Sequence, residues 1–284
     1  MVAEIINGKE LSSELKLNMK EKVSDLKKNK IVPHLTVILV GDNPASKSYV
    51  NGKKKACAET GISSDIIEMA DSISEEKLLS TINKLNQDQS VHGILVQLPL
   101  PDHINEQHII EAIDPKKDVD GFHPVNIGKM MTGADTFLPC TPFGIVTMLK
   151  SKDINISGQH VVIIGRSNIV GKPVGQLLLN ENATVTYCHS KTEDLRSFTT
   201  NADILIVAIG KANVLTEEYL KPGAVVIDVG INRLDNGRLT GDVDFENVKN
   251  KASFITPVPK GVGPMTITML LQNTIKAAEG LEKQ

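Results

Sequence analysis

The chain has 284 residues, which is enough for one large domain or two, and we expect two. Its 31 Lys and Arg are nearly balanced by 34 Asp and Glu, so the formal net charge is only -3. This balance excludes the broad basic field that gathers nucleic acid or an anionic membrane. The expected partners are therefore small molecules or other subunits.

The first half of the chain alternates short apolar runs with helical stretches from Leu35 onward, a pattern typical of βαβ units and a parallel sheet. Asn43 can cap a helix, and Pro44 suits its first position. The pattern predicts strands at 35–40, 66–69 and 93–98, helices from 44 onward, at 75–85 and at 105–113, and a loop at 114–121.

The second half begins where Thr141 and Pro142 repeat the cap-then-proline start of a helix, which should run to about Lys150. Four apolar strands are then predicted at 160–164, 184–188, 204–208 and 225–229, as in a dinucleotide-binding domain. A last helix is predicted from Pro264 to about Gly280. The expected fold is two α/β domains: residues 1–139, with the helix at about 268–284 packing back on them, and a Rossmann-type parallel sheet at 140–267.

The N-terminal segment and the cysteines bear on localisation and redox state. The segment MVAEIINGKE lacks the apolar run of a signal peptide, and no apolar stretch approaches the roughly 20 residues that span a bilayer. Cys57, Cys140 and Cys188 are odd in number, far apart and without CxxC spacing. We expect a cytoplasmic protein with reduced thiols, and neither a disulfide framework nor a metal site.

A glycine-rich turn follows the first strand of the second domain. The segment VVIIGRSNIVGKPVG places Gly165 at a strand end, Gly171 in the turn and Gly175 in the start of a helix. Amides at such a helix start can hold a phosphate. The spacing is not GxGxxG, however, and any strand-to-helix turn can need glycine, so this segment alone leaves a purely structural explanation equally open.

The end of the next strand decides between cofactors. An NAD-binding unit usually ends this strand with an acid that binds the ribose hydroxyls. Here ATVTY runs into residues 188–192, CHSKT, which offer hydroxyl and cationic donors and no carboxylate to repel a 2′-phosphate. Arg166 adds a cation from the glycine turn; arginine is usually a surface residue, but this chain has only four. NADP is therefore expected rather than NAD.

Candidate catalytic residues occur in the first domain. Tyr49 and Lys53 lie four residues apart on a predicted helix, so a ring could stack on a flat substrate while the amine exchanges a proton. Against this, the lysine run 53–55 resembles an ordinary solvated helix face. Gln97 is a polar amide near the carboxyl end of the apolar strand ILVQLPL, where open α/β sheets present ligands. Asp118 and Asp120, in KKDVDG, could accept hydrogen bonds from a ring edge, and they lack the spacing of a calcium loop.

Seven collinear motifs resemble the bifunctional methylenetetrahydrofolate dehydrogenase and methenyltetrahydrofolate cyclohydrolase family. They are VGDNPASKSYVNGKKKACAETGI, GILVQLPLP, DPKKDVDGFHPVNIG, LPCTP, GRSNIVGKPVG, ATVTYCHSKT and TPVPKGVGPMT. They cover nearly the whole chain in order, and together they are far more specific than a single glycine pattern.

The resemblance implies oxidation of 5,10-methylene-tetrahydrofolate with NADP, followed by hydrolysis to 10-formyl-tetrahydrofolate. It implies an N-terminal folate-binding catalytic domain, a C-terminal NADP-binding domain, a folate cleft between them and a homodimer. Lys53 would be the central catalytic group, Tyr49 would orient or stack on folate, Gln97 would hydrogen-bond near the lysine, and Asp120 would hold the pterin. The other implied contacts are Leu98, Pro99 and Pro264 to the substrate, Arg166 and Ser190 to the 2′-phosphate, and Gly165, Ser167, Gly171 and Ile231 to the cofactor.

Two positions depart from the family pattern. Lys260 stands where TPVPGGVGP is usual, and Ala212 replaces a usual proline after Gly210 and Lys211. The first departure puts a loop geometry and substrate affinity in question, and the second should only loosen a turn.

Three other functions were weighed. A monofunctional dehydrogenase that could use NAD is disfavoured by the pairs Lys53 with Gln97 and Arg166 with Ser190. A dehydrogenase of another small molecule, such as a shikimate-type acid, would leave DVDG and YVNGK unexplained. A non-catalytic nucleotide-sensing scaffold would not need the lysine and the glutamine.

Overall fold

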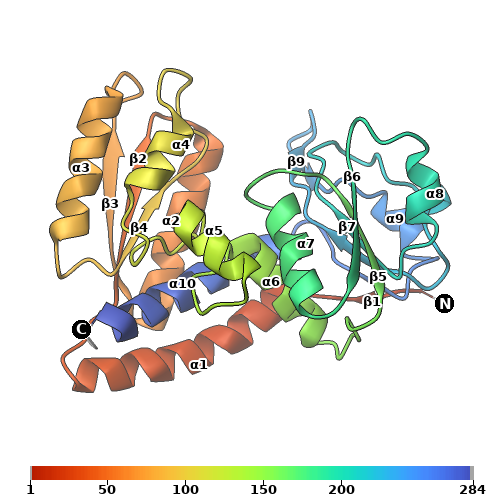
Figure 1. Cartoon of the computed structure of the whole chain (residues 1–284), viewed down its shortest axis with the longest axis horizontal. Coiled ribbons are helices and arrows are strands. Elements are labelled where there is room, and N and C mark those ends of the chain that lie inside the picture. The colour runs from red at the N-terminus through yellow and green to blue at the C-terminus, as the bar shows by residue number, and fades with distance from the viewer. Residues whose placement is uncertain (1, 282–284) are drawn as a thin grey trace. The chain divides into compact units, whose positions relative to one another are not determined.

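The computed structural model of the chain describes residues 2–281 (Figure 1). The chain divides into two compact units. One contains the residues up to Ser13 together with Thr141–Thr266, and the other contains Glu14–Cys140 together with the chain from Ile267 onward. Two long helices, α1 (Gly8–Lys28) and α10 (Val262–Leu281), contribute most of their length to the second of these, here called the lysine unit because it carries Lys53.

The lysine unit is built on a three-stranded parallel sheet in the order β3-β2-β4. Its strands are β2 (His34–Val40), β3 (Ser63–Met69) and β4 (Gly93–Val96). Its other helices are α2 (Pro44–Thr60), α3 (Glu75–Gln87), α4 (Glu106–Ala112) and α5 (Pro124–Met131). Ile38 and Ile94 pack with Leu78, Ile82 and Ile109 of α3 and α4, so these helices cover one face of the sheet. Successive side chains of a strand point to opposite faces of the sheet. The face not covered by α3 and α4 is therefore the one against which α2, a neighbour of β2 and β3, can pack.

The other unit contains a six-stranded sheet in the order β1-β11-β8-β7-β5-β6, in which every pairing is parallel. The strands are β1 (Glu4–Ile5), β5 (His160–Ile164), β6 (Thr184–Cys188), β7 (Ile204–Val207), β8 (Val225–Asp228) and β11 (Phe254–Ile255). The remaining elements are α6 (Cys140–Lys150), α7 (Gly171–Asn180), α8 (Leu195–Thr199), η1 (Glu217–Tyr219), α9 (Phe245–Val248) and the antiparallel pair β9 (Asn232–Arg233) and β10 (Leu239–Thr240). We call it the Rossmann unit.

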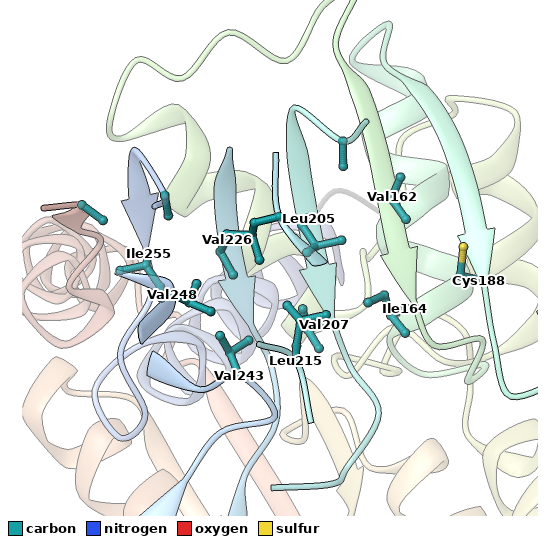
Figure 2. Close-up of a cluster of buried hydrophobic side chains, with 14 residues drawn as sticks. Val162, Ile164, Cys188, Leu205, Val207, Leu215, Val226, Val243, Val248 and Ile255 are labelled. Atoms are coloured by element: carbon teal, nitrogen blue, oxygen red, sulfur yellow. The ribbon is translucent and has the colours of Figure 1, made fainter. Parts of the chain in front are cut away.

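The core of the Rossmann unit is a layer of aliphatic side chains from its central strands. Figure 2 shows Val162 and Ile164 of β5 beside Leu205 and Val207 of β7, with Val226 of β8 next to them. The chain goes from β5 to β6 on one side and then returns to β7 on the other. This reversal places a ligand-binding crevice at the carboxyl ends of β5 and β7 in sheets of this kind. The expected α/β fold with a Rossmann-type parallel sheet is confirmed.

The first residues of the chain differ from the expected domain boundaries. Residues 1–139 were assigned to one domain, but β1 pairs with β11, with Ile5 opposite Ile255, and so belongs to the Rossmann unit. A two-residue strand carries no periodic pattern, and its partner is about 250 residues away. The helices α1 and α5 were also missed; in α1 only a narrow apolar stripe, Met19, Val23 and Leu26, is buried.

Candidate functional site

Helix α2 directs one lysine inward and leaves its neighbours in solvent. The side chain of Asn43 caps the helix by accepting from the amides of Ala45 (2.9 Å) and Ser46 (3.2 Å). Lys53 lies on the buried face with Val50 and is only 7% exposed, whereas residues 54 and 55 are exposed. The interpretation of residues 53–55 as a solvated face therefore holds for the last two and not for Lys53.

The amine of Lys53 is held by an amide. Its Nζ donates to Oε1 of Gln97 at 2.9 Å, and Nε2 of Gln97 donates to the carbonyl of Leu98 at 2.7 Å. Gln97 follows β4, and its own backbone amide donates to the carbonyl of Ile38 at 2.9 Å. Because both ends of the side-chain amide are engaged, the oxygen is fixed toward the lysine.

The Lys53 amine and two groups that interact with it, Asp120 and Cys140, have pKa values shifted toward their neutral forms. Burial lowers the pKa of Lys53, although the negative charge of Asp120 opposes the shift. Burial raises the pKa of Asp120, which the lysine charge counteracts, and it raises the pKa of the Cys140 thiol well above its ordinary value. A lysine whose neutral form is favoured can accept a proton and return it, which is the chemistry of a general base.

The other expected folate contacts belong to α2, to the loop after β4 and to α10. Tyr49 is one turn before Lys53 on α2 and is 38% exposed, and partial burial raises the pKa of its phenol. Leu98 is half-buried and Pro99 is exposed in the loop after β4. Pro264 lies in the first turn of α10, in a part of that helix that belongs to the Rossmann unit.

The two aspartates of KKDVDG have different environments. Asp118 is buried, and its Oδ1 accepts from the amides of Gly121 and Phe122, both at 3.2 Å. Its Oδ2 accepts from the amide of His123 (2.8 Å) and from Nδ2 of Asn126 (2.7 Å). These donors occupy the Asp118 carboxylate, so it holds the loop, and only Asp120 remains as a candidate acceptor for a ring edge. The expectation that both could serve a ligand is thus narrowed to one.

Sequence reasoning missed a second support for this loop. Asn273, on α10, uses its Nδ2 to donate to the carbonyls of Val119 (2.8 Å) and Leu138 (3.0 Å). Cys140, which was considered only as a reduced thiol, donates through Sγ to the Val119 carbonyl at 3.3 Å. No local pattern could have identified Asn273, because about 150 residues separate it from its partner.

The glycine turn of the Rossmann unit allows close backbone approach. Gly165 has φ 134°, and a Cβ there would lie 2.4 Å from the carbonyl oxygen of Ala208. A Cβ on Gly175 would lie 2.1 Å from Oη of Tyr187. Oγ of Ser167 accepts at 3.2 Å from the amide of Gly171, the first residue of α7.

Arg166 and Ser190 are placed alike on neighbouring turns. Ile164 of β5 pairs with Cys188 of β6, and each candidate follows its strand end by two residues. Both side chains are exposed, and no carboxylate occurs between residues 188 and 192. The turns after β5 and β6 therefore offer a cation and a hydroxyl at the same edge of the sheet, which suits a phosphate monoester. Ile231, after β8, is 46% exposed.

Lys260 adopts a backbone conformation that favours glycine. Its φ is 84°, at the position where the family pattern usually has glycine, and its side chain is exposed. Such a φ costs a residue with a side chain about 1–2 kcal/mol. The departure therefore acts first on the backbone of this loop.

Among residues 2–281, no helix is long and apolar enough to cross a membrane, and no group of three or more His, Cys, Asp or Glu side chains could hold a metal ion.

The Rossmann unit and the buried lysine–amide pair together define a two-unit enzyme that uses a nicotinamide dinucleotide. The chain belongs to the tetrahydrofolate dehydrogenase/cyclohydrolase family: the model of the catalytic domain matches residues 6–120, and that of the NAD(P)-binding domain matches residues 139–282. It is accordingly an enzyme with the family's two activities, a dehydrogenase and a cyclohydrolase, as the sequence motifs predicted.

Individual relatives agree with this assignment. The chain is 69% identical to the bifunctional protein FolD of Oceanobacillus iheyensis over 280 residues, which are 99% of this chain and 98% of the relative. The solved structure of the bifunctional enzyme FolD from Campylobacter jejuni is 54% identical, with a TM-score of 0.97 and coverage of 98% of this chain and 99% of that one. A Trypanosoma brucei FolD solved with NADP and an inhibitor is 35% identical, with a TM-score of 0.96 and full coverage of both chains.

Proposed function

We propose that the chain oxidises 5,10-methylene-tetrahydrofolate to the 5,10-methenyl cation with NADP and then hydrolyses this cation to 10-formyl-tetrahydrofolate, with Lys53 as the proton-exchanging group. The observation that carries the proposal is the buried amine of Lys53, fixed 2.9 Å from the Gln97 amide oxygen.

When bound, NADP would supply the hydride acceptor for the first step. The residues that would hold it are Gly165, Arg166, Ser167, Gly171, Ser190 and Ile231. Their fit to the cofactor rests on the exposed Arg166 and Ser190 at paired strand ends. The absence of a carboxylate from residues 188–192 favours NADP over NAD, because a carboxylate there would repel the 2′-phosphate.

Lys53 acts in the second step. The water oxygen bonds to the methenyl carbon while the neutral amine of Lys53 takes one proton from that water. The protonated amine of Lys53 then returns its proton to the pterin-ring nitrogen as the bond from the carbon to that nitrogen breaks, and the remaining hydroxyl proton passes to solvent as the formyl C=O forms. Burial favours the neutral amine that this step needs, and the Gln97 oxygen directs it.

The substrate contacts in this proposal are Tyr49, Gln97, Leu98, Pro99, Asp120 and Pro264. Tyr49 stacks on the folate ring, because its partly exposed side chain lies one turn from Lys53 on the same helix. Asp120 accepts hydrogen bonds from the pterin edge, because Asp118 and Asn273 hold the loop that carries it.

The assembly and location belong to the same proposal. We infer a homodimer from the family resemblance. A cytoplasmic location is supported by the three cysteines, all buried free thiols of the kind that a reducing compartment maintains. Sedimentation of the purified protein and fractionation of cells test these two inferences.

The proposal is tested by an absorbance assay on the purified chain. We expect reduction of NADP, and slower or no reduction of NAD, when 5,10-methylene-tetrahydrofolate is supplied, together with decay of the methenyl compound above its spontaneous rate. Reduction without faster decay would leave a dehydrogenase alone and remove the role of Lys53. If the chain neither reduced NADP with the methylene compound nor accelerated decay of the methenyl compound, the proposal would be refuted.

A further inference from the structure

Two buried carboxylates of the Rossmann unit lie near the carboxyl ends of its strands. Neither belongs to the cofactor contacts named above. Asp228 ends β8 and is 3% exposed, and Asp242 follows β10 and is fully buried. Burying a carboxylate is costly unless charge or hydrogen bonds compensate it. Their hydrogen-bond partners should therefore show why they are there.

Asp242 joins two loops. Its Oδ2 accepts from the amides of Ile209 (2.6 Å) and Gly210 (2.9 Å), which follow β7. Its Oδ1 accepts from the amide of Lys211 (2.9 Å) and from Nδ2 of Asn232 (2.8 Å), the first residue of β9. One side chain thus ties the loop after β7 to the loop after β8.

Asp228 fixes the segment that carries Asp242. Its Oδ1 accepts from the amides of Gly230 (3.0 Å) and Asp242 (2.9 Å), and its Oδ2 accepts from the amide of Val243 (3.0 Å). Contact is so close at Gly241 that a Cβ there would lie 1.8 Å from Oδ2 of Asp228. The two carboxylates therefore accept seven N–H hydrogen bonds in total, three at Asp228 and four at Asp242.

These loops lie at a particular place in the sheet. They follow β7 and β8, on the opposite side of the strand reversal from the turns after β5 and β6 that carry Arg166 and Ser190. A dinucleotide lies across such a reversal with one half on each side. Ile231 is held between Gly230 and Asn232, which both bond to the carboxylate pair, and its own side chain stays 46% exposed.

We propose that Asp228 and Asp242 are positioning residues that hold the 209–211 and 230–232 loops in place for the nicotinamide half of the cofactor. The inference rests on the proposed function of this unit as the NADP site. Neither carboxylate touches the cofactor; each acts through the backbone that it binds. The adenosine half, with its 2′-phosphate, binds on the other side and does not depend on the pair.

The test is the variant Asp242→Asn, with binding measured by calorimetry for NADP and for adenosine 2′,5′-bisphosphate. The amide keeps one acceptor oxygen but turns an NH₂ group toward two former donors, so the loops lose their anchor. We expect NADP to bind about 10- to 100-fold more weakly. The bisphosphate, which carries only the adenosine half, should bind within about twofold of the parent, and KM for NADP should rise by a larger factor than kcat falls.

Asp203→Asn is the matched control. Asp203 accepts from the amide of His160 at 2.9 Å and pairs with Lys221, but it precedes β7 and so lies at the amino end of the sheet. This variant should lose stability without the selective loss of NADP. If Asp242→Asn does not fold, Asn232→Ala removes one donor to Asp242 and should weaken NADP several-fold, again without affecting the bisphosphate.

The outcomes separate the two proposals. Equal losses for NADP and bisphosphate in Asp242→Asn, or no loss for NADP, would overturn the positioning role while leaving the function intact. A parent protein that binds neither compound would instead refute the proposed cofactor site.

Discussion

Replacement of Lys53 by Met removes the proposed base while keeping most of the side chain. The apolar stem still fills its place on the buried face of α2, so the helix packing should persist. The side-chain oxygen of Gln97 loses its 2.9 Å donor, which costs about 1–3 kcal/mol for a buried acceptor. This cost is partly offset, because the variant no longer buries an amine whose charged form is disfavoured in the folded chain. We expect the free energy of unfolding to change by no more than about 2 kcal/mol at neutral pH.

The pH dependence of stability checks this balance. The pKa of Lys53 in the folded chain lies below its ordinary value of 10.5, so between these two values the unfolded chain binds more protons. The parent's stability therefore rises with pH across this window, and its deficit is fully present below the lowered pKa. Denaturant unfolding of Lys53→Met should lack this rise.

The effect on catalysis should be much larger. General acid–base catalysis contributes about 10²- to 10⁴-fold, or about 3–5 kcal/mol of transition-state stabilisation. We expect the decay of methenyl-tetrahydrofolate, corrected for its spontaneous rate, to slow by this factor, while calorimetry shows NADP bound as in the parent. Lys54→Met, an exposed neighbour on the same helix, should leave both unchanged. The reasoning would be refuted if Lys53→Met hydrolysed methenyl-tetrahydrofolate at the parent's rate, or if Lys54→Met lost as much of this activity as Lys53→Met.

Three further changes test other parts of the molecule. Asp120→Asn removes the negative charge that raises the pKa of Lys53, so the rise of cyclohydrolase kcat with pH should move to lower pH. If the pH profile of kcat does not move, Asp120 does not influence the titration of Lys53. Arg166→Ala should weaken NADP about 10- to 100-fold in a binding titration and NAD less than about twofold, and equal losses would remove the phosphate contact. Gly175→Ala should lower the free energy of unfolding by about 1–3 kcal/mol through overpacking, while Gly128→Ala, with open space around it, should change it by less than about 1 kcal/mol in denaturant melts.

Local chemistry determined many elements of this fold. Asn43 and Pro44 start α2 because a side-chain acceptor and a fixed φ act within one turn. Four of the six strands of the Rossmann sheet, β5, β6, β7 and β8, were predicted within a residue, and three of them, β5, β7 and β8, are the buried, largely apolar runs typical of parallel strands. The motifs also sufficed to assign the family and its cofactor.

Long-range packing decided the rest. Only the folded chain distinguishes Lys53 from its exposed neighbours, because burial and the position of Gln97 depend on how α2 lies against the sheet. Only it shows that Asp118 holds a loop with Asn273. Hydrogen bonds between residues far apart in sequence, and the desolvation that shifts a pKa, arise from neighbours that no local pattern specifies. The sequence by itself determined most of the longer elements and the family, whereas the tertiary structure decided which polar side chains are free to act.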